Sequence, residues 1–258
     1  MSNAGHERIA EAFASSGKRA ALMPYLMGGF PTMAASGDVA KAYVAGGADL
    51  VELGIPFSDP LADGPVIHEA GTAALAAGAT TKAVLDLGAK LARHVPVVVM
   101  TYANLVLARG VEPFATGLAE RGISGLIVPD VPFEEAPTLL EACDAVGVAL
   151  VPLVAPTTPD ERLRAIGGRA RGFLYTVSVA GTTGERAGGE YAALVARAQD
   201  ATDVPVAVGF GIGAPERAAE VADAGADGVI VGSRLVRAAG DGEDVEALVR
   251  GFADALRA

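Results

Sequence analysis

The sequence predicts an α/β protein built as a single (β/α)8 barrel, the TIM barrel, with an extra N-terminal helix and a further helix inserted after strand 2. Three observations predict this fold: apolar runs rich in β-branched residues recur eight times, Ala/Leu-rich stretches with helical spacing separate them, and glycine marks the helix ends. Eight strand–helix units in 258 residues fit a closed barrel well. An open, doubly wound sheet is the structural alternative.

The expected strands are continuous apolar runs, which is typical of parallel strands buried on both faces. They cover residues 21–27, 50–53, 95–100, 125–129, 148–154, 172–178, 204–210 and 228–233. Helical spacing is found over residues 33–45, 81–94, 112–121, 134–145 and 215–224, with a final helix near 244–256. The first 16 residues have the pattern of an amphipathic helix. No linker or change of composition divides the chain, so we expect one domain over residues 1–258.

Two connections are longer than the barrel needs. After strand 2, a proline-rich loop precedes an additional helical stretch over 66–77. After strand 6, the Gly/Thr-rich segment VAGTTGERAGGE covers 179–190. Connections that follow strands lie at the C-terminal face of a barrel, where active sites are built, and long loops in compact folds are usually functional or disordered. We expect both to be functional.

Charge and composition limit the partners. A formal charge of −11 argues against nucleic acid or an anionic membrane, although N–H groups at a helix start can still hold a small anion. The single cysteine, Cys143, fits a reducing cytoplasm, and no apolar run approaches the roughly 20 residues of a membrane helix. The three histidines lack ligand-spaced partners, so we expect no metal. The composition predicts a soluble, cytoplasmic protein.

Glu52 is a carboxylate inside the apolar run of strand 2. Alternation places it on the same face as Leu50, with Val51 and Leu53 on the other face. At the C-terminal rim of a barrel, partial desolvation would raise the pKa of this carboxyl and suit it to proton transfer. A structural glutamate, bonded to a neighbouring strand or loop, is the alternative.

The loop FSDPLADG adds two carboxylates. Asp59 precedes Pro60, which favours a role in a turn. Asp63 precedes Gly64 and Pro65 just before the extra helix, which it could cap. Position alone ranks the two aspartates about equally.

Glycine-rich turns indicate a phosphate site. GFGIG follows strand 7, VGS ends strand 8, and each opens a helix. Loops after strands 7 and 8 with a short extra helix form the recurring phosphate site of this barrel class. The loop AGTTG at 180–184 could add hydroxyl and N–H donors. The residues therefore indicate a phosphate-binding barrel enzyme with a carboxylate acid/base.

Five motifs, in order from about residue 23 to 233, closely resemble the tryptophan synthase alpha subunit family: LVELGIPFSDPLADGPVI, MTYANLV, VPDVPFEE, YTVSVAGTTGER, and VGFGI with ADGVIVGS. The resemblance implies retro-aldol cleavage of indole-3-glycerol phosphate to indole and glyceraldehyde 3-phosphate, without metal or organic cofactor. It also implies a partner, the pyridoxal-phosphate-dependent beta subunit, which receives indole through a tunnel in an alpha2beta2 assembly. A stand-alone lyase that releases indole and a non-catalytic activator of a beta subunit are the alternatives.

The same resemblance implies the site residues. Glu52 would protonate the indole C3 carbon and accept a proton from the glycerol hydroxyl, Asp63 would engage the indole N–H, and Asp59 would remain a turn residue. Phosphate would rest on Gly184, Gly211, Gly232 and Ser233. The indole pocket would be lined by Tyr25, Met100 and Phe210, with Tyr175 beside Glu52 and with Thr183 tying loop 6 to Asp63. The region 104–105 and the helix after strand 2 would face the beta subunit.

Three positions depart from the commonest pattern of that family: Phe30, Thr182 and Arg234. None coincides with an acid, a glycine or the threonine named above. They bear on loop packing, phosphate affinity and subunit coupling rather than on the reaction.

Overall fold

The computed structural model describes residues 4–178 and 189–257, and the strands in these ranges form one parallel sheet in the order β5-β4-β3-β2-β1-β9-β8-β7-β6. The strands are β1 (Ala21–Met27), β2 (Val51–Gly54), β3 (Val97–Met100), β4 (Gly125–Ile127), β5 (Ala149–Leu150), β6 (Leu153–Val154), β7 (Leu174–Val177), β8 (Val206–Gly209) and β9 (Gly228–Val231). The two ends of this order, β5 and β6, are consecutive in the sequence. The sheet therefore closes on itself.

The closure occurs within the fifth expected strand, which Val151 and Pro152 divide in two. The Val151 N–H donates to the Leu126 carbonyl at 2.9 Å, and the Pro152 carbonyl accepts from the Tyr175 N–H at 3.0 Å. Proline has no N–H to continue the ladder with β4. The expected barrel is thus confirmed, but the expected continuous strand over 148–154 is wrong: β5 pairs with β4, and β6 pairs with β7.

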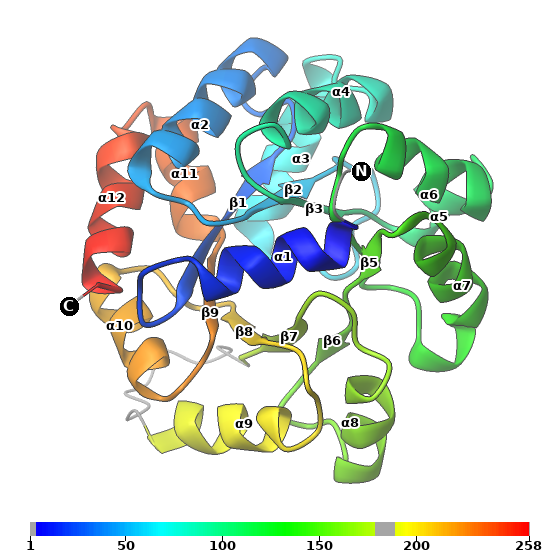
Figure 1. The fold of residues 1–258 in the computed structure, drawn as a ribbon. Coiled ribbons are helices and arrows are strands. Elements are labelled where there is room, and N and C mark those ends of the chain that lie inside the picture. Colours follow the sequence, from blue (N-terminus) through cyan, green and yellow to red (C-terminus); the bar gives the residue numbers. More distant parts are fainter. Residues whose placement is uncertain (1–3, 179–188, 258) are drawn as a thin grey trace.

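Helices surround the strands on the outside of the barrel (Figure 1). They are α1 (Gly5–Ala14), α2 (Met33–Gly46), α3 (Pro65–Ala76), α4 (Thr81–Leu91), α5 (Ala103–Leu107), α6 (Val111–Glu120), η1 (Phe133–Glu135), α7 (Pro137–Val146), α8 (Asp160–Gly167), α9 (Gly189–Gln199), α10 (Pro215–Asp223), α11 (Ser233–Asp241) and α12 (Val245–Ala255). The inserted helix after strand 2 is α3, as expected. The helix expected over 134–145 is instead a 3-10 turn, η1, followed by α7, which starts at Pro137 because proline fits a first helical turn. The short α5 was not expected.

The N-terminal helix α1 crosses one end of the barrel (Figure 1). Its Ile9 is fully buried with the barrel interior, and its Phe13 ring lies 5.7 Å from the Phe173 ring. A Cβ on Gly228, the first residue of β9, would meet Phe13. Since Gly228 begins its strand, α1 covers the N-terminal ends of the strands, and the opposite end is left to the loops that follow them.

Alternating residues of the strands belong to two buried layers. The inward layer fills the barrel and includes Met23, Tyr25, Leu50, Val98, Met100, Ile127, Tyr175, Ala207 and Ile230. The outward layer packs under the helices and includes Leu22, Val51, Leu53, Val97, Val99, Val208 and Val229. Glu52 lies two residues after Leu50, so its side chain is on the same face of the strand and points into the barrel. No helix in the described ranges is long and apolar enough to cross a membrane.

A buried ion pair joins the segment before β1 to the turn before β2. The Lys18 ammonium donates to both Asp49 carboxylate oxygens at 2.7 and 2.8 Å, and the side chains are only 3% and 12% exposed. Asp49 also accepts the Leu22 N–H at 2.7 Å. Burial raises the pKa of Asp49, although the hydrogen bonds from Lys18 and Leu22 act in the opposite direction. Each charge depends on the other, because an unpaired buried charge is costly.

We expect Asp49→Ala to lower the free energy of unfolding by about 3 kcal/mol or more, because it leaves the Lys18 ammonium buried and unpaired. The matched control is Asp38→Ala, whose ion pair with Lys41 is about four-fifths exposed on both sides. That variant should change stability by no more than about 0.5 kcal/mol. Urea unfolding at pH 7 measures both. Equal losses of unfolding free energy in the two variants would show that the buried pair stabilises the fold no more than the exposed pair does.

Candidate active site

A cavity of about 330 Å³ opens at the C-terminal ends of the strands. This volume lies in the range of small-molecule sites. Both expected acids line it, as do all the other expected site residues that lie in the described ranges: Tyr25, Glu52, Asp63, Met100, Tyr175, Phe210, Gly211, Gly232 and Ser233. The expected residues Thr183 and Gly184, and the divergent Thr182, lie outside the described residues.

Glu52 is the most unusual side chain of the cavity. It is the second residue of β2, pairs with Tyr25 of β1 and Val98 of β3, and is 1% exposed. Its Oε2 atom has no hydrogen-bond partner among the described residues. Buried polar atoms are nearly always satisfied, and because Glu52 lines the cavity, this oxygen can bond to a group bound there.

Burial, reinforced by the negative charge of Asp63, raises the pKa of Glu52 to about 8. The carboxyl is therefore mainly protonated at neutral pH. A group with a pKa near the working pH can donate a proton and then accept one. The sequence-based expectation of a raised pKa agrees with this environment.

Two buried tyrosines flank Glu52, and glycines make room for them. A Cβ on Gly54, at the end of β2, would overlap the Tyr25 hydroxyl, and one on Gly209, at the end of β8, would overlap the Tyr175 hydroxyl. Burial raises the pKa of both tyrosines, with Asp63 and Glu52 adding to the shift in Tyr25, and Glu52 and Tyr25 adding to it in Tyr175. Both hydroxyls therefore remain protonated beside the acid.

Beside Asp63, loop 2 contacts Tyr102, a residue that the sequence analysis did not select. Burial raises the pKa of Asp63, while the nearby Tyr102 hydroxyl and the charge of His68 oppose the shift. The same hydroxyl accepts the Ala62 N–H at 3.1 Å, and the Tyr102 ring stacks on Phe57 at 5.3 Å. Tyr102 lies two residues after the end of strand 3, and this position was the signal that could have identified it.

The two aspartates of loop 2 have different surroundings. Asp63 does not cap α3, whose N-cap is Gly64 without a side-chain hydrogen bond, so the capping interpretation is wrong. Asp59 is exposed, accepts the Ser58 hydroxyl at 2.5 Å, and does not line the cavity. The fold thus separates two residues that position alone could not rank.

The opposite end of the cavity is rich in backbone N–H groups. Phe210 and Gly211 follow β8 with φ near +73°, and Gly232 is the N-cap of α11. The first N–H groups of a helix have no helical acceptor and favour an anion. Arg237 also lines this end, as does Arg234, whose guanidinium binds Glu243 at 2.7 and 3.0 Å.

The divergent Phe30 also packs against α11. A Cβ on Gly240 would come within 2.9 Å of the Phe30 ring, so glycine at this position leaves room for the aromatic side chain. The loop after β1 is thereby tied to the helix that begins at Ser233. The Phe30 side chain, which departs from the family pattern, is therefore tightly packed against α11.

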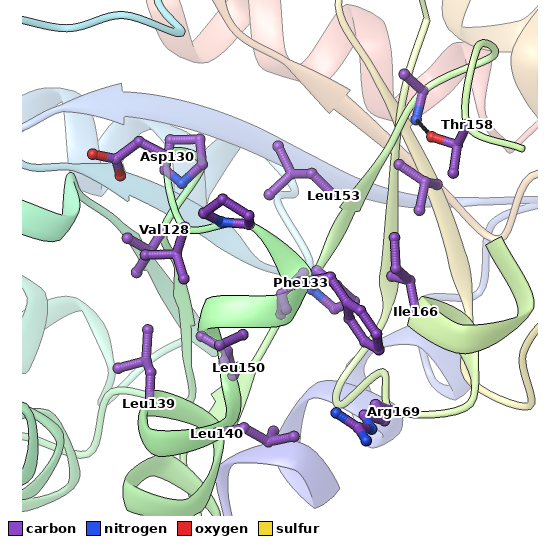
Figure 2. Close-up of a pocket in the computed structure, with 18 of the residues that line it drawn as sticks. Val128, Asp130, Phe133, Leu139, Leu140, Leu150, Leu153, Thr158, Ile166 and Arg169 are labelled. Atoms are coloured by element: carbon purple, nitrogen blue, oxygen red, sulfur yellow. Dashed lines mark hydrogen bonds between the residues drawn. The ribbon is translucent and has the colours of Figure 1, made fainter. Parts of the chain in front are cut away.

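A second hollow, of about 690 Å³, lies beside the cavity between the loop after β4 and the segment formed by β6 and α8 (Figure 2). Its lining is mainly apolar and includes Val128, Phe133, Leu139, Leu140, Leu150, Leu153 and Ile166. The Arg169 guanidinium lies 5.1 Å from the centre of the Phe133 ring. Neither Glu52 nor Asp63 lines this hollow, but Leu61 and Ala62 do, so loop 2 borders both spaces.

Other reactive groups lie elsewhere. Burial raises the pKa of the Cys143 thiol to about 12, so this buried thiol stays protonated at neutral pH. Within residues 4–178 and 189–257, no group of three or more His, Cys, Asp or Glu side chains is arranged to hold a metal ion.

A buried carboxyl with a raised pKa at the mouth of a (β/α)8 barrel, with a second acid on a loop, is the arrangement expected of an enzyme that works by acid–base chemistry. Residues 12–254 match the family model described as "Tryptophan synthase alpha chain". The chain belongs to the tryptophan synthase alpha chain family, the lyases of tryptophan biosynthesis that its motifs indicated.

Individual relatives agree. The tryptophan synthase alpha chain of Methanosarcina mazei is 50% identical over 242 residues, covering 93% of this chain and 89% of the relative. That of Synechococcus sp. is 50% identical over 223 residues, covering 85% and 83%. A structure of Mycobacterium tuberculosis tryptophan synthase superposes with a TM-score of 0.90 at 39% identity, covering 97% and 98% of the two chains. The alpha subunit from Legionella pneumophila gives 0.88 at 34% identity, covering 98% of each chain.

The raised pKa of Glu52 predicts how stability depends on pH. The folded chain keeps a proton that the unfolded chain releases near pH 4.5, so stability is lost as the pH rises from about 4.5 to about 8. Glu52→Gln cannot ionise and should be more stable than the parent at pH 9, with a difference that shrinks toward pH 5. Thermal unfolding at pH 5, 7 and 9 measures this difference.

The control is Glu134→Gln. This carboxylate is exposed, and its pKa is lowered by Arg162, so any stability that it contributes is lost as the pH falls rather than rises. A stability gain in Glu52→Gln that is independent of pH would contradict a protonated Glu52 in the folded state.

Proposed function

We propose that this chain cleaves indole-3-glycerol phosphate to indole and glyceraldehyde 3-phosphate, with Glu52 as acid and base and Asp63 as the partner of the indole nitrogen. One observation supports this most strongly: a carboxyl whose pKa is about 8 shares a cavity with a second carboxyl group. A retro-aldol reaction needs a proton donor that becomes a proton acceptor within the same turnover.

The reaction begins with protonation of the indole ring. The Glu52 carboxyl gives its proton to C3, and the ring becomes an iminium whose positive charge lies on the nitrogen. The Asp63 carboxylate stabilises that charge through the N–H. The bond between C3 and the glycerol carbon then breaks, its electron pair returns to the ring, and the Glu52 carboxylate takes the proton of the adjacent hydroxyl. Indole and an aldehyde leave, and Glu52 is protonated again.

The cavity has a suitable place for each part of this substrate. The indole ring lies among Tyr25, Met100 and Phe210, with Tyr175 beside Glu52. The phosphate lies at Gly211, Gly232 and Ser233, where free N–H groups favour an anion. Gly184 completes the phosphate site, and Thr183 joins loop 6 to Asp63 when the loop closes over the substrate.

The partner in this proposal is a beta subunit in an alpha2beta2 heterotetramer. Exposed apolar side chains border the mouth of the barrel: Leu61 of loop 2 is 88% exposed, and Leu107 of α5 is 65% exposed. Together with the apolar hollow beside the cavity (Figure 2), they offer the kind of surface that marks an interface. The region 104–105 and the helix after strand 2, α3, belong to the same face.

The remaining parts of the proposal follow from the family. The proton transfers described above need no metal or organic cofactor in this chain, and pyridoxal phosphate belongs to the beta subunit. The chain works in the cytoplasm as one domain over residues 1–258. A stand-alone lyase that releases indole is the second candidate, because the same residues serve it. Fast turnover of the purified chain without a beta subunit would favour that candidate.

We expect Glu52→Gln to slow indole release by about a thousandfold or more with little change in KM, because the amide cannot exchange the proton. Asp63→Asn should lose about a hundredfold or more. Asp59→Asn is the matched control from the same loop and should keep most activity, since Asp59 lies outside the cavity. Steady-state indole formation measures all three. Exchanged phenotypes for the two aspartates would refute the assignment of loop 2.

We expect Leu107→Asp to weaken binding to a beta subunit about tenfold or more, because it places a charge in an apolar contact. Its basal cleavage should stay unchanged, while the stimulation by a beta subunit is reduced. Ala10→Asp adds the same charge on an exposed position of α1 at the other end of the barrel and should bind normally. Titration calorimetry and indole release measure the two effects. Normal binding by Leu107→Asp would place the interface elsewhere.

A further inference from the structure

The turn after β8 has an unusual backbone. Phe210 is the one residue other than glycine with a positive φ in the described ranges, at +73°, and Gly211 follows at +73°. L-amino acids with a bulky side chain rarely adopt this conformation, because the Cβ atom crowds the carbonyl oxygen. Such a conformation persists only where the surroundings enforce it.

Ser178 forms the hydrogen bonds that hold Phe210 in this conformation. It follows β7 directly and is 7% exposed. Its hydroxyl lies 2.7 Å from the Phe210 carbonyl oxygen and 3.0 Å from the Gly209 carbonyl oxygen, and its N–H donates to the Gly209 carbonyl at 3.0 Å. The single hydroxyl hydrogen serves both carbonyls. The end of β7 is thereby bound to the turn after β8.

This contact fixes the direction of the next N–H. The Phe210–Gly211 peptide is trans, so its carbonyl and its N–H point to opposite sides. Because the Phe210 carbonyl is turned toward Ser178, the Gly211 N–H points away from Ser178. Gly211 lines the cavity together with Gly232 and Ser233. The Phe210 ring is also fixed, edge-on to Tyr175 at 6.3 Å.

We propose that Ser178 is a positioning residue, which holds the Phe210–Gly211 turn in its left-handed conformation so that the Gly211 N–H meets the phosphate of the substrate. This inference rests on the proposed function for the identity of the ligand. Ser178 does not line the cavity and acts only through the turn. Its contribution therefore belongs to substrate binding at the phosphate end and not to proton transfer at Glu52.

The test compares ligands with and without phosphate. In Ser178→Ala, we expect the KM for indole-3-glycerol phosphate and the Kd for inorganic phosphate to rise by about tenfold, with kcat changed less than about threefold. The Kd for indole should change less than about twofold. Ser178→Thr keeps the hydroxyl and should restore most of the phosphate affinity. Ser124→Ala is the control, since its hydroxyl is buried without a partner in the described ranges.

A double variant keeps the test sharp if Ser178→Ala is unstable. Glycine adopts a φ of +73° without support. Removal of the Ser178 hydroxyl should therefore weaken phosphate binding much less in a Phe210→Gly background than in the parent. If Ser178→Ala weakens phosphate binding by the same factor in the parent and in the Phe210→Gly background, the proposal is overturned. Equal losses of indole affinity and phosphate affinity in Ser178→Ala would overturn it as well. A parent chain that binds no phosphate would overturn the proposed function as well, whereas normal phosphate binding by Ser178→Ala would overturn this inference alone.

Discussion

The burial of one carboxyl group inside the barrel is the constraint on which the site depends. Glu52 belongs to the inward layer of β2, where it is 1% exposed and one of its oxygens has no partner among the described residues. An isolated carboxylate at such a place is costly, so the group keeps its proton instead. The same burial that destabilises the folded chain at high pH keeps a proton on Glu52 at neutral pH.

The rest of the architecture makes this burial possible. Helix α1 covers the N-terminal end of the barrel, and the apolar inward layer below Glu52 excludes water from that side. Gly54 and Gly209 let two tyrosines lie close beside the carboxyl at the open end. The parallel strands β1, β2, β3, β7 and β9 bring residues to one rim, so loops can supply chemistry while the strands keep the acid fixed.

Sequence reasoning succeeded where the determining interactions are local. The period of two along a strand places Glu52 on the inner face without knowledge of the neighbours. It could not rank Asp59 and Asp63, because their difference arises from the contact of loop 2 with Tyr102, about 40 residues further along the chain. Ser178 was missed for the same reason: its role depends on a turn 32 residues away. The division of the fifth strand also depends on which neighbour each half meets.

Loop 2 links the interface and the acid by electrostatics. The Tyr102 hydroxyl binds the Ala62 N–H next to Asp63, and α5 begins at the next residue and carries the exposed Leu107. A beta subunit that contacts α5, as proposed, would therefore lie next to Tyr102, which binds loop 2 beside Asp63. Because the charge of Asp63 raises the pKa of Glu52, a movement of Asp63 toward Glu52 raises that pKa further, and a movement away lowers it. In the proposed complex, a beta subunit on α5 would change the fraction of Glu52 that carries a proton only through such a displacement of Asp63. Coupling of this kind needs no relay of packed side chains from the interface to the acid, only a small displacement of one charged loop residue.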